Sequence, residues 1–276
     1  MYQTHFQWFI KLMGGNEMEH ALISFSFDDA RADNYAAFNK VLFLRNIPVT
    51  LNVTTGYVDG SCLESNKPCA KPALTKSQVI ELSKNPLVEI ALHGDNHLNT
   101  VSDISVGRDK LIKWFEKDQE CTFGFASPGS QMSVSDFIST DEQTLMNYIV
   151  YMRHSLRIID KHTLRVFARR VCRITHIPYL YKVAYKNTIM HECSDRVIYA
   201  VPVLKDTSVN ELISLIKQCV KEKGALVLMF HSIVDDVTNE DNWSWATSKF
   251  EALCDYIKYN RITTCTTMDM YTQLVN

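Results

Sequence analysis

The chain has 276 residues, of which 46% are hydrophobic and 22% are charged, and its formal net charge is -2. This length suits one domain, because single α/β barrels of about 200–250 residues are common. The small net charge argues against a nucleic-acid-binding protein, and the apolar runs are too short for a membrane span of about 18 residues.

The first segment, residues 1–20, lacks the pattern of a secretory signal peptide. Its apolar stretch, residues 6–13, is short and is interrupted by Gln7 and Lys11. No basic region precedes this stretch, and no small-residue cleavage site follows it. We therefore expect a cytoplasmic protein, with a secreted or cell-envelope location as the alternative if a leader is missing from the sequence.

Short apolar runs then alternate with helical patterns, which predicts a mostly parallel sheet with helices outside it. In the first half of the chain, strands are expected at residues 21–27, 48–53, 88–92 and 121–126. Helices are expected at residues 33–46, 76–83 (after Thr75 as N-cap) and 106–117. Residues 54–73 are rich in turn-forming residues and are expected to form a long loop.

The second half continues the alternation and ends with helices. Strands are expected at residues 148–154, 196–203 and 225–230, helices at 209–221 and 248–259, then a short strand through Cys265 and a closing helix. We expect a single domain over residues 1–276, with a helical insertion at 155–192. The basic, aromatic part of this insertion is interpreted as a solvated helix face, with binding of an anionic polymer or of a lipid-linked sugar head group as the alternative.

Several candidate reactive residues directly follow predicted strands. Asp28 and Asp29 follow the first strand, His93 follows the third, and His231 follows the strand at residues 225–230. In a barrel of parallel strands the carboxyl ends form the active-site face, so these side chains should converge. Adjacent aspartates point in different directions, so one can bind a cation while the other faces a substrate; a helix N-cap or a solvated turn is the alternative.

Three histidines have the chemistry of metal ligands or proton carriers. His93 and His97 are four residues apart, and on a helical turn this spacing would place both imidazoles on one face. Surface or capping histidines also occur at this spacing. His231 has a side chain that titrates near neutral pH and suits a general acid, whereas a satisfied core histidine is the alternative.

Together these motifs resemble the polysaccharide deacetylase family, also called the NodB-homology domain or carbohydrate esterase family four. The family's T-F-D-D-G corresponds to residues 26–30, its H-[ST]-x-x-H to residues 93–97, and its L-x-H to residues 229–231. The match spans nearly the whole chain. The resemblance implies a distorted (β/α) barrel of about seven parallel strands that removes N-acetyl groups from an amino sugar, oligosaccharide or polysaccharide.

The resemblance also implies a role for each matching residue. Asp29, His93 and His97 would hold a divalent metal, with zinc as the expected ion and cobalt, nickel or manganese as alternatives. Asp28 would be the general base and His231 the general acid. The metal would polarise the acetyl carbonyl and activate the attacking water, and backbone N–H groups after the fourth strand would help to hold the oxyanion.

The chain departs from the family pattern at three places. Ala30 replaces a glycine, which should alter the turn only mildly. Gly94 replaces a serine or threonine whose hydroxyl would orient the ligand histidines. Residues 125–129 stand where the family has R-x-P-[FY], without the arginine and the aromatic residue. Arg153 is a candidate substitute for that arginine, and an ordinary surface arginine is the alternative; the family's D-x-x-D-W motif has no clear match.

Two other functions stay open at this point. The altered third motif leaves room for a hydrolase of a non-sugar amide on the same barrel. A non-catalytic carbohydrate-binding domain is the other, although retention of both Asp28 and His231 argues against it. Among smaller signals, Trp243 and Trp245 are expected to form an N-terminal helix staple or to pack in the core, with stacking on a sugar ring as the alternative. Cys62 and Cys69 flank a loop and would bridge only in an oxidising compartment.

Overall fold

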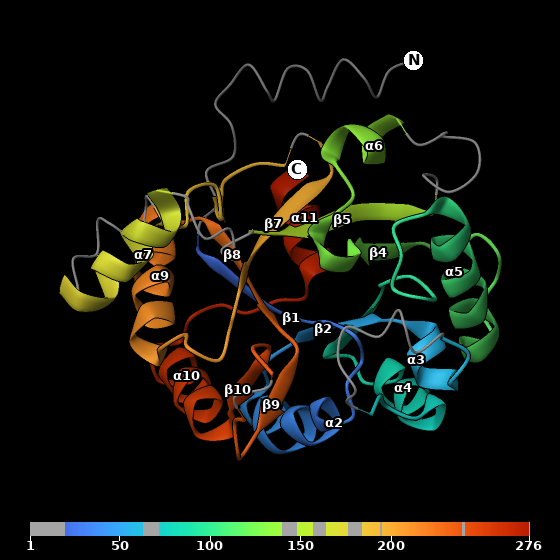
Figure 1. Cartoon of the computed structure of the whole chain (residues 1–276), viewed down its shortest axis with the longest axis horizontal. Helices are drawn as coiled ribbons and strands as arrows, with labels where there is room; N and C mark the ends of the chain where they lie inside the picture. The colour runs from blue at the N-terminus through green and yellow to red at the C-terminus, as the bar shows by residue number, and fades with distance from the viewer. Residues whose placement is uncertain are drawn as a thin grey trace.

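Seven parallel strands close into a barrel with helices around it (Figure 1). The computed structural model describes residues 20–62, 72–139, 148–156, 164–175, 184–193, 195–238 and 241–275. Around the barrel the order is β1 (Leu22–Phe27), β2 (Val49–Val53), β3 (Val88–Leu92), β4 (Phe123–Ala126), β5 (Ile149–Ser155), β7 (Val197–Pro202) and β8 (Ala225–Phe230). This architecture confirms the distorted (β/α) barrel expected from the sequence.

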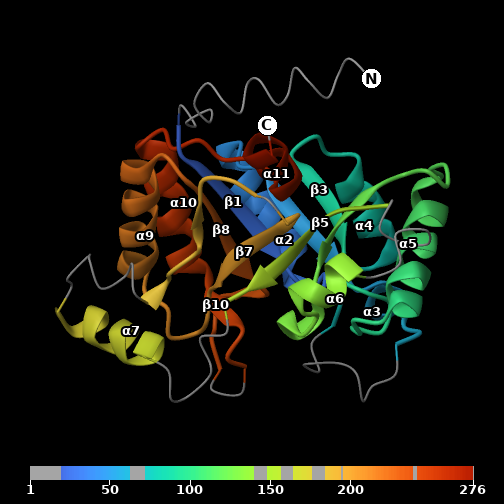
Figure 2. The same cartoon turned by 90° about the horizontal axis from the view of Figure 1, so that it is seen from above.

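Pairing of the first strand with the last closes the barrel. The register of β1 and β8 runs from Leu22 opposite Ala225 to Phe27 opposite Phe230. The backbone N–H of Asp28 extends this contact by donating to the carbonyl oxygen of Phe230 at 2.9 Å. Because the seven strands are parallel, their carboxyl ends meet at one end of the barrel, toward which β5 and β7 point in Figure 2.

Apolar side chains pack in two places, inside the barrel and between the barrel and the helices. On β1, Phe25 faces outward and lies edge-on to Phe250 of α10 (Thr247–Tyr259), with ring centroids 6.0 Å apart. A second cluster combines small side chains, such as Ala200 and Val227, with larger ones, such as Tyr151 and Met229. Because β8 is buried on both faces, it reads as a continuous apolar run, whereas β1 alternates, with Ser24 and Ser26 buried between apolar residues.

The helices mostly follow the sequence prediction. The remaining α-helices are α2 (Asp33–Ala37), α3 (Thr55–Asp59), α4 (Lys76–Ser83), α5 (Val101–Phe115), α6 (Val134–Ser139), α7 (Leu164–Thr175), α9 (Val209–Glu222) and α11 (Thr267–Val275). At α4, Thr75 and Gln78 form a reciprocal capping box, which confirms the predicted start. Across the described ranges, no helix has the length and apolar character that crossing a membrane requires.

Four local predictions are wrong. The helix expected at 33–46 is interrupted, because α2 passes into a π-helical turn and a 3-10 turn before Asn46 adopts a left-handed conformation. Helix α3 occupies part of the expected loop, whose residues 63–71, including Cys69, lie outside the described residues. Ile189–Met190 forms a short strand, β6, antiparallel to β8, where helix was expected. The strand expected through Cys265 is reduced to a single bridge between Ile23 and Thr264.

The last helix, α11, closes the amino end of the barrel. The Thr267 hydroxyl oxygen lies 3.0 Å from Ser24 Oγ of β1 and 2.9 Å from the Thr50 hydroxyl oxygen of β2. The backbone N–H of Met268 donates to Glu89 Oε2 of β3 at 2.9 Å. These contacts fill the amino end with polar side chains, so that the opposite end remains for a functional site.

Candidate active site

A cavity of about 280 Å³ lies at the carboxyl ends of the strands. Asp28, His93, His97 and His231 line it, and they come from segments that follow β1, β3 and β8. Trp243 also contributes to the wall. The structure therefore brings together side chains that lie up to about 200 residues apart in the sequence, at the end of the barrel where the strand-end argument predicted them.

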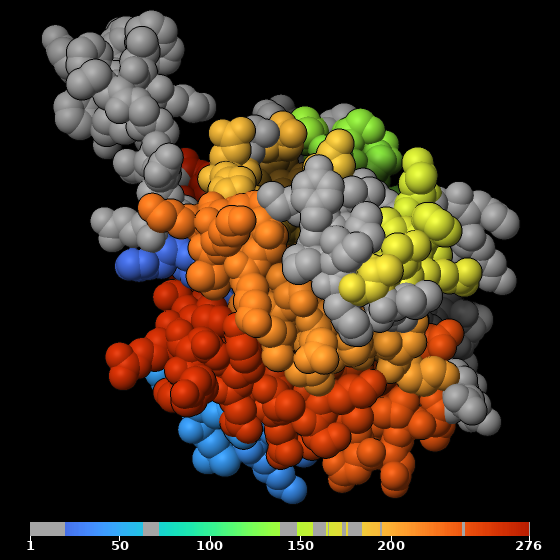
Figure 3. Space-filling view, turned by 90° about the vertical axis from the view of Figure 1, so that its left-hand side faces the viewer, coloured from blue at the N-terminus to red at the C-terminus, as the bar shows by residue number. Residues whose placement is uncertain are grey.

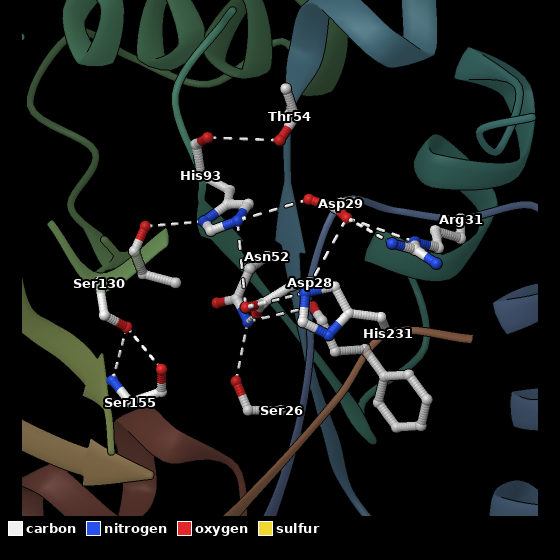
Figure 4. Close-up of polar contacts among 12 residues, drawn as sticks. Ser26, Asp28, Asp29, Arg31, Asn52, Thr54, His93, Ser130, Ser155 and His231 are labelled. Atoms are coloured by element: carbon white, nitrogen blue, oxygen red, sulfur yellow. Dashed lines mark hydrogen bonds and ion pairs between the residues drawn. The ribbon is translucent and has the colours of Figure 1, made fainter. Parts of the chain in front are cut away.

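Asp29, His93 and His97 are spaced as the ligands of one cation would be. Asp29 Oδ1 lies 3.5 Å from Nε2 of His93 and 3.5 Å from Nε2 of His97 (Figure 4 shows Asp29 and His93). One ligand atom from each residue lies within 4.8 Å of the others. In a tetrahedral site with bonds of about 2.0–2.1 Å, two ligand atoms are about 3.3–3.4 Å apart. The distances from Asp29 thus match those of a zinc-like site.

The hydrogen bonds of this group also fit a metal. Asp29 Oδ1 is buried and has no hydrogen-bond partner among the described residues. His93 Nδ1 lies 2.8 Å from the carbonyl oxygen of Ala126, which can only accept, so Nδ1 carries the proton and Nε2 presents its lone pair. A buried oxygen with no donor beside an oriented imidazole is what an oxygen- and nitrogen-liganded cation would satisfy.

The charges around the imidazoles favour the same interpretation. Burial by itself lowers the pKa of His93, but Asp28 and Asp29 outweigh this effect and raise it, so the field at this ring favours a positive charge. Burial, reinforced by the charge of His93, lowers the pKa of His97 to about 4. His97 is therefore neutral at pH 7, which is the form that ligates metals.

His93 and His97 meet through a loop, and the helical turn expected from their spacing is wrong. Gly94 and His97 both have positive φ angles, +76° and +60°, which fold the chain back on itself. The carboxylate of Asp103 on α5 fixes the loop by accepting backbone N–H bonds from Asp95, at 3.0 Å, and Leu98, at 3.0 Å. The geometry therefore depends on a residue from the following helix.

Gly94 is required by this loop. A Cβ at Gly94 would lie 2.5 Å from Asp103 Oδ2 and 3.0 Å from the carbonyl oxygen of Leu98. The serine or threonine of the family motif would not fit here without movement of the loop. The Asp103 carboxylate instead fixes the backbone of the loop that carries both histidines.

Arg153 is buried and holds Asp28, so it is not an ordinary surface arginine. Its Nη2 donates to both carboxylate oxygens of Asp28 at 2.6 Å, and Asn52 Nδ2 donates to Oδ1 at 2.8 Å. In the register of β4 and β5, Arg153 lies opposite Ala126, which occupies the arginine position of the family's R-x-P-[FY]. The arginine therefore reaches the same carboxylate from the neighbouring strand.

The environment keeps Asp28 ionised. Burial by itself raises the pKa of this carboxyl group, but the positive charge of Arg153 and the neighbouring His93 and His231 outweigh it. The pKa of Asp28 therefore lies below its usual range, and the group is a carboxylate that can accept a proton.

His231 lies on the side of Asp28 and Asp29 that is away from His93 (Figure 4). Its Nε2 is 4.0 Å from Asp28 Oδ2 and 4.0 Å from Asp29 Oδ2, and its ring contacts Trp243 with centroids 4.4 Å apart. Burial lowers the pKa of His231 to about 4, although both carboxylates act against this. The ring is therefore neutral at pH 7.

Arg31 belongs to the site and was missed in the sequence. It is 3% exposed and donates to Asp29 Oδ2 from Nη2 at 3.2 Å and from Nε at 3.3 Å. Its Nη1 donates to Ser232 Oγ at 3.0 Å and to Asp241 Oδ2 at 3.1 Å. Because Arg31 engages Oδ2, Oδ1 of Asp29 faces the histidines. A single arginine after D-D-A carries no pattern that would have indicated its burial.

The alanine at position 30 strains the backbone of the turn more than the mild change expected from the sequence. Both Asp29 and Ala30 lie in the left-handed region, with φ angles of +71° and +51°. A residue with a Cβ pays about 1–2 kcal/mol for this conformation, whereas glycine does not. The turn that presents Asp29 is therefore strained by its own sequence.

The two tryptophans have different environments. Trp245 is buried, and its Nε1 donates to the carbonyl oxygen of Thr207 at 2.9 Å, which confirms the core position expected for it. Trp243 is half-buried: it packs against the core cluster that contains Met229, as expected, and it also lines the cavity beside His231. It offers an apolar ring to whatever binds there.

Comparison with known proteins identifies the fold. No protein-family model and no curated protein sequence matches the chain. Among solved structures, a putative polysaccharide deacetylase from Mycobacterium smegmatis aligns over 95% of this chain and 92% of its own, with a TM-score of 0.55 and 10% identity. The catalytic domain of a peptidoglycan N-acetylglucosamine deacetylase from Eubacterium rectale aligns over 93% of each chain, with a TM-score of 0.44 and 13% identity. At such identities, the Mycobacterium likeness shows a shared fold.

Proposed function

We propose that this protein is a metal-dependent hydrolase that removes N-acetyl groups from an amino sugar, oligosaccharide or polysaccharide and releases acetate. One observation carries the proposal. A two-histidine, one-aspartate group (Asp29, His93 and His97) lies beside a second buried carboxylate, Asp28, which Arg153 keeps ionised. The Mycobacterium smegmatis protein with which the chain shares its fold is described as a putative polysaccharide deacetylase, which supports the choice of a sugar substrate.

The first part of the reaction follows from the groups around Asp28. A divalent metal, zinc being the expected ion, would be held by Asp29, His93 and His97 and would supply Lewis acidity toward the acetyl carbonyl and the attacking water. Asp28 takes the proton of that water. Arg153 and Asn52 hold the carboxylate in place and lower its tendency to bind a proton before the reaction begins.

The second part needs a proton on the leaving nitrogen. His231 is neutral before the reaction, because burial lowers its pKa to about 4. Its Nε2 lies 4.0 Å from Asp28 Oδ2, a gap that one bridging water spans, so the proton taken by Asp28 would pass through that water to this nitrogen and from there to the leaving amine. The backbone N–H of Ser130 donates to the carbonyl oxygen of Ser127. The backbone N–H of Gly129, in the same turn, is therefore the candidate donor to the oxyanion.

A hydrolase of a non-sugar amide is the second candidate. Leu156, Pro202 and Met229 give the cavity an apolar side, and Gly129 stands where the family has an aromatic residue. Both features suit a substrate with an apolar part beside its acetamide. The two candidates share Asp28 and the metal-binding group, and they differ in what binds around the acetyl group.

Acetate release tests the proposal. Full-length protein is stripped of metal, reloaded with zinc and incubated with acetylated chitooligosaccharides, peptidoglycan fragments and simple N-acetylated aryl amines. We expect zinc-dependent acetate release from a sugar substrate. Release from the aryl amines alone would favour the second candidate, and one bound zinc without acetate from any substrate would contradict both.

Three variants separate the roles of the residues. Asp28→Asn should lower turnover by about 10²–10⁴-fold while one zinc remains bound, because it removes the base and leaves the ligands. His93→Ala should lose zinc. His154→Ala, a histidine of β5 outside the metal-binding group, is the matched control and should keep it. Full zinc content in His93→Ala, or full turnover in Asp28→Asn, would refute the assigned role.

A further inference from the structure

Helix α7 lies in a segment with an unusual charge. Residues 161–190 contain seven lysines and arginines and no aspartate or glutamate, although the whole chain has a net charge of -2. This segment therefore holds about a quarter of the 29 basic residues of the chain. The proposed reaction uses none of them.

One face of α7 is fixed to the barrel. Arg169 is 7% exposed, and its Nε donates to Glu211 Oε1 of α9 at 2.7 Å. Its Nη2 donates to Thr207 Oγ1 at 3.0 Å. Ala168 and Cys172 are buried on neighbouring positions of the same helix. The helix is thus oriented by a buried ion pair and apolar contacts.

Another face of α7 presents apolar side chains to the outside. Leu164 is 82% exposed and Phe167 is 67% exposed, and residues three apart lie on the same side of a helix. Val171 continues this row and Arg170 is exposed beside it. Figure 3 shows α7, in yellow, on the surface of the molecule.

The position of α7 relates this surface to the cavity. In Figure 2, α7 lies at the end of the barrel toward which β5 and β7 point, the end that holds the cavity. Leu156, which lines the cavity, precedes Leu164 by eight residues in the chain. A surface that α7 contacts would therefore lie on the side of the molecule from which a ligand enters.

We propose that α7 docks the protein onto a lipid bilayer that contains anionic lipids. Helices that lie in a membrane interface combine exposed Leu or Phe side chains with an excess of Lys and Arg, which the anionic head groups attract. A soluble polyanion would use the basic residues but would gain nothing from Leu164 and Phe167. The combination of both features therefore favours a bilayer. Docking is independent of the proposed reaction.

Vesicle flotation with the full-length protein tests this inference. Vesicles of phosphatidylcholine alone are compared with vesicles containing about 30% phosphatidylglycerol. We expect the protein to float with the anionic vesicles, less so at high salt, and to stay behind with the neutral ones. Leu164→Asn/Phe167→Asn should weaken binding by about tenfold or more, because two apolar side chains no longer enter the interface. Arg170→Glu should weaken it and reduce the salt dependence.

Leu44→Asn is the matched control, since Leu44 is 77% exposed on a different element, the 3-10 turn Phe43–Arg45. It should bind as the unchanged protein does. Circular dichroism melting checks that each variant folds, and exposed positions should melt alike. Absence of flotation, equal flotation with neutral vesicles, or unchanged flotation of the double variant would overturn the proposal. Heparin could also release the protein completely from the vesicles and bind the double variant as tightly as the unchanged protein. This result would point to a soluble polyanion as the ligand and would also overturn the proposal.

Discussion

The arginine that holds the proposed base comes from a different strand in this chain than the family motif would place it on. Arg153 of β5 lies opposite Ala126 of β4 and donates to both oxygens of Asp28. Arg153→Ala would leave a buried, unpaired carboxylate, which costs about 3–5 kcal/mol of folding stability. We expect a loss of turnover of about 10²-fold or more, because the pKa of Asp28 would rise.

A second substitution distinguishes loss of the arginine beside Asp28 from general destabilisation of the fold. Register partners of parallel strands point to the same side, so Ala126→Arg in the Arg153→Ala background should recover much of the turnover. Arg45→Ala is the control, because Arg45 pairs with the exposed Asp255 at 2.6 Å and such surface pairs contribute little. Steady-state kinetics and urea unfolding report both effects. Unchanged turnover in Arg153→Ala would show that Asp28 works without it.

Arg31 and a bound metal ion would both neutralise the negative charge of the Asp29 carboxylate. Arg31→Gln removes the cation that pairs with the buried carboxylates of Asp29 and Asp241, and the metal-free protein should lose about 3–5 kcal/mol of stability. The attraction of the site for a divalent cation should grow. Zinc should therefore raise the melting temperature of the variant by more than it raises that of the unchanged protein.

Calorimetric melting with and without zinc, together with zinc titration, measures this difference. Asp241→Asn is a useful companion, because it removes one partner of Arg31 and leaves the Arg31–Asp29 contact in place. Its response to zinc should stay close to that of the unchanged protein. A smaller zinc response in Arg31→Gln would mean that Arg31 matters more for aiming Asp29 than for its charge.

At the scale of elements, the loop after β3 makes a prediction that opposes the family pattern. Gly94→Ser restores the residue type of the motif, but its Cβ would lie 2.5 Å from Asp103 Oδ2. We expect a loss of about 2–5 kcal/mol of stability, from left-handed strain and overpacking, and at least tenfold weaker zinc binding. Gly60→Ser has the same φ of +76° and no atom within 4 Å, so it isolates the strain. Equal losses in the two variants would refute the clash.

The elements that the sequence predicted well carry their signals locally. The start of α4 is encoded by Thr75 and Gln78, two residues of the same turn that bond to one another, and β8 is a continuous apolar run. The loop that joins His93 to His97 has no such signal. It depends on a left-handed conformation at a histidine and on Asp103 from the next helix, neither of which spacing alone reveals.

At the scale of the whole molecule, parallel topology made much of the site predictable. Once strands were placed, their carboxyl ends had to meet, so Asp28, His93 and His231 were expected at one face. Side-chain direction was not predictable in the same way. Arg31 and Arg153 reach the carboxylates because the barrel brings their distant segments to the same place, which local sequence patterns do not reveal.

The opposite end of the barrel should carry stability without carrying chemistry. There the buried Tyr151 hydroxyl donates to Glu89 Oε1 at 2.6 Å, and Glu89 also accepts from Thr50 and from the first turn of α11. Tyr151→Phe should cost about 1.5–3 kcal/mol, because it removes a bond to a charged acceptor in a buried network. Tyr35 donates to Glu81 in the same way at the surface, so Tyr35→Phe should leave stability unchanged. Urea midpoints compare the two, and zinc content should stay at one per chain in both; equal midpoints would show that α11 closes the barrel without help from this network.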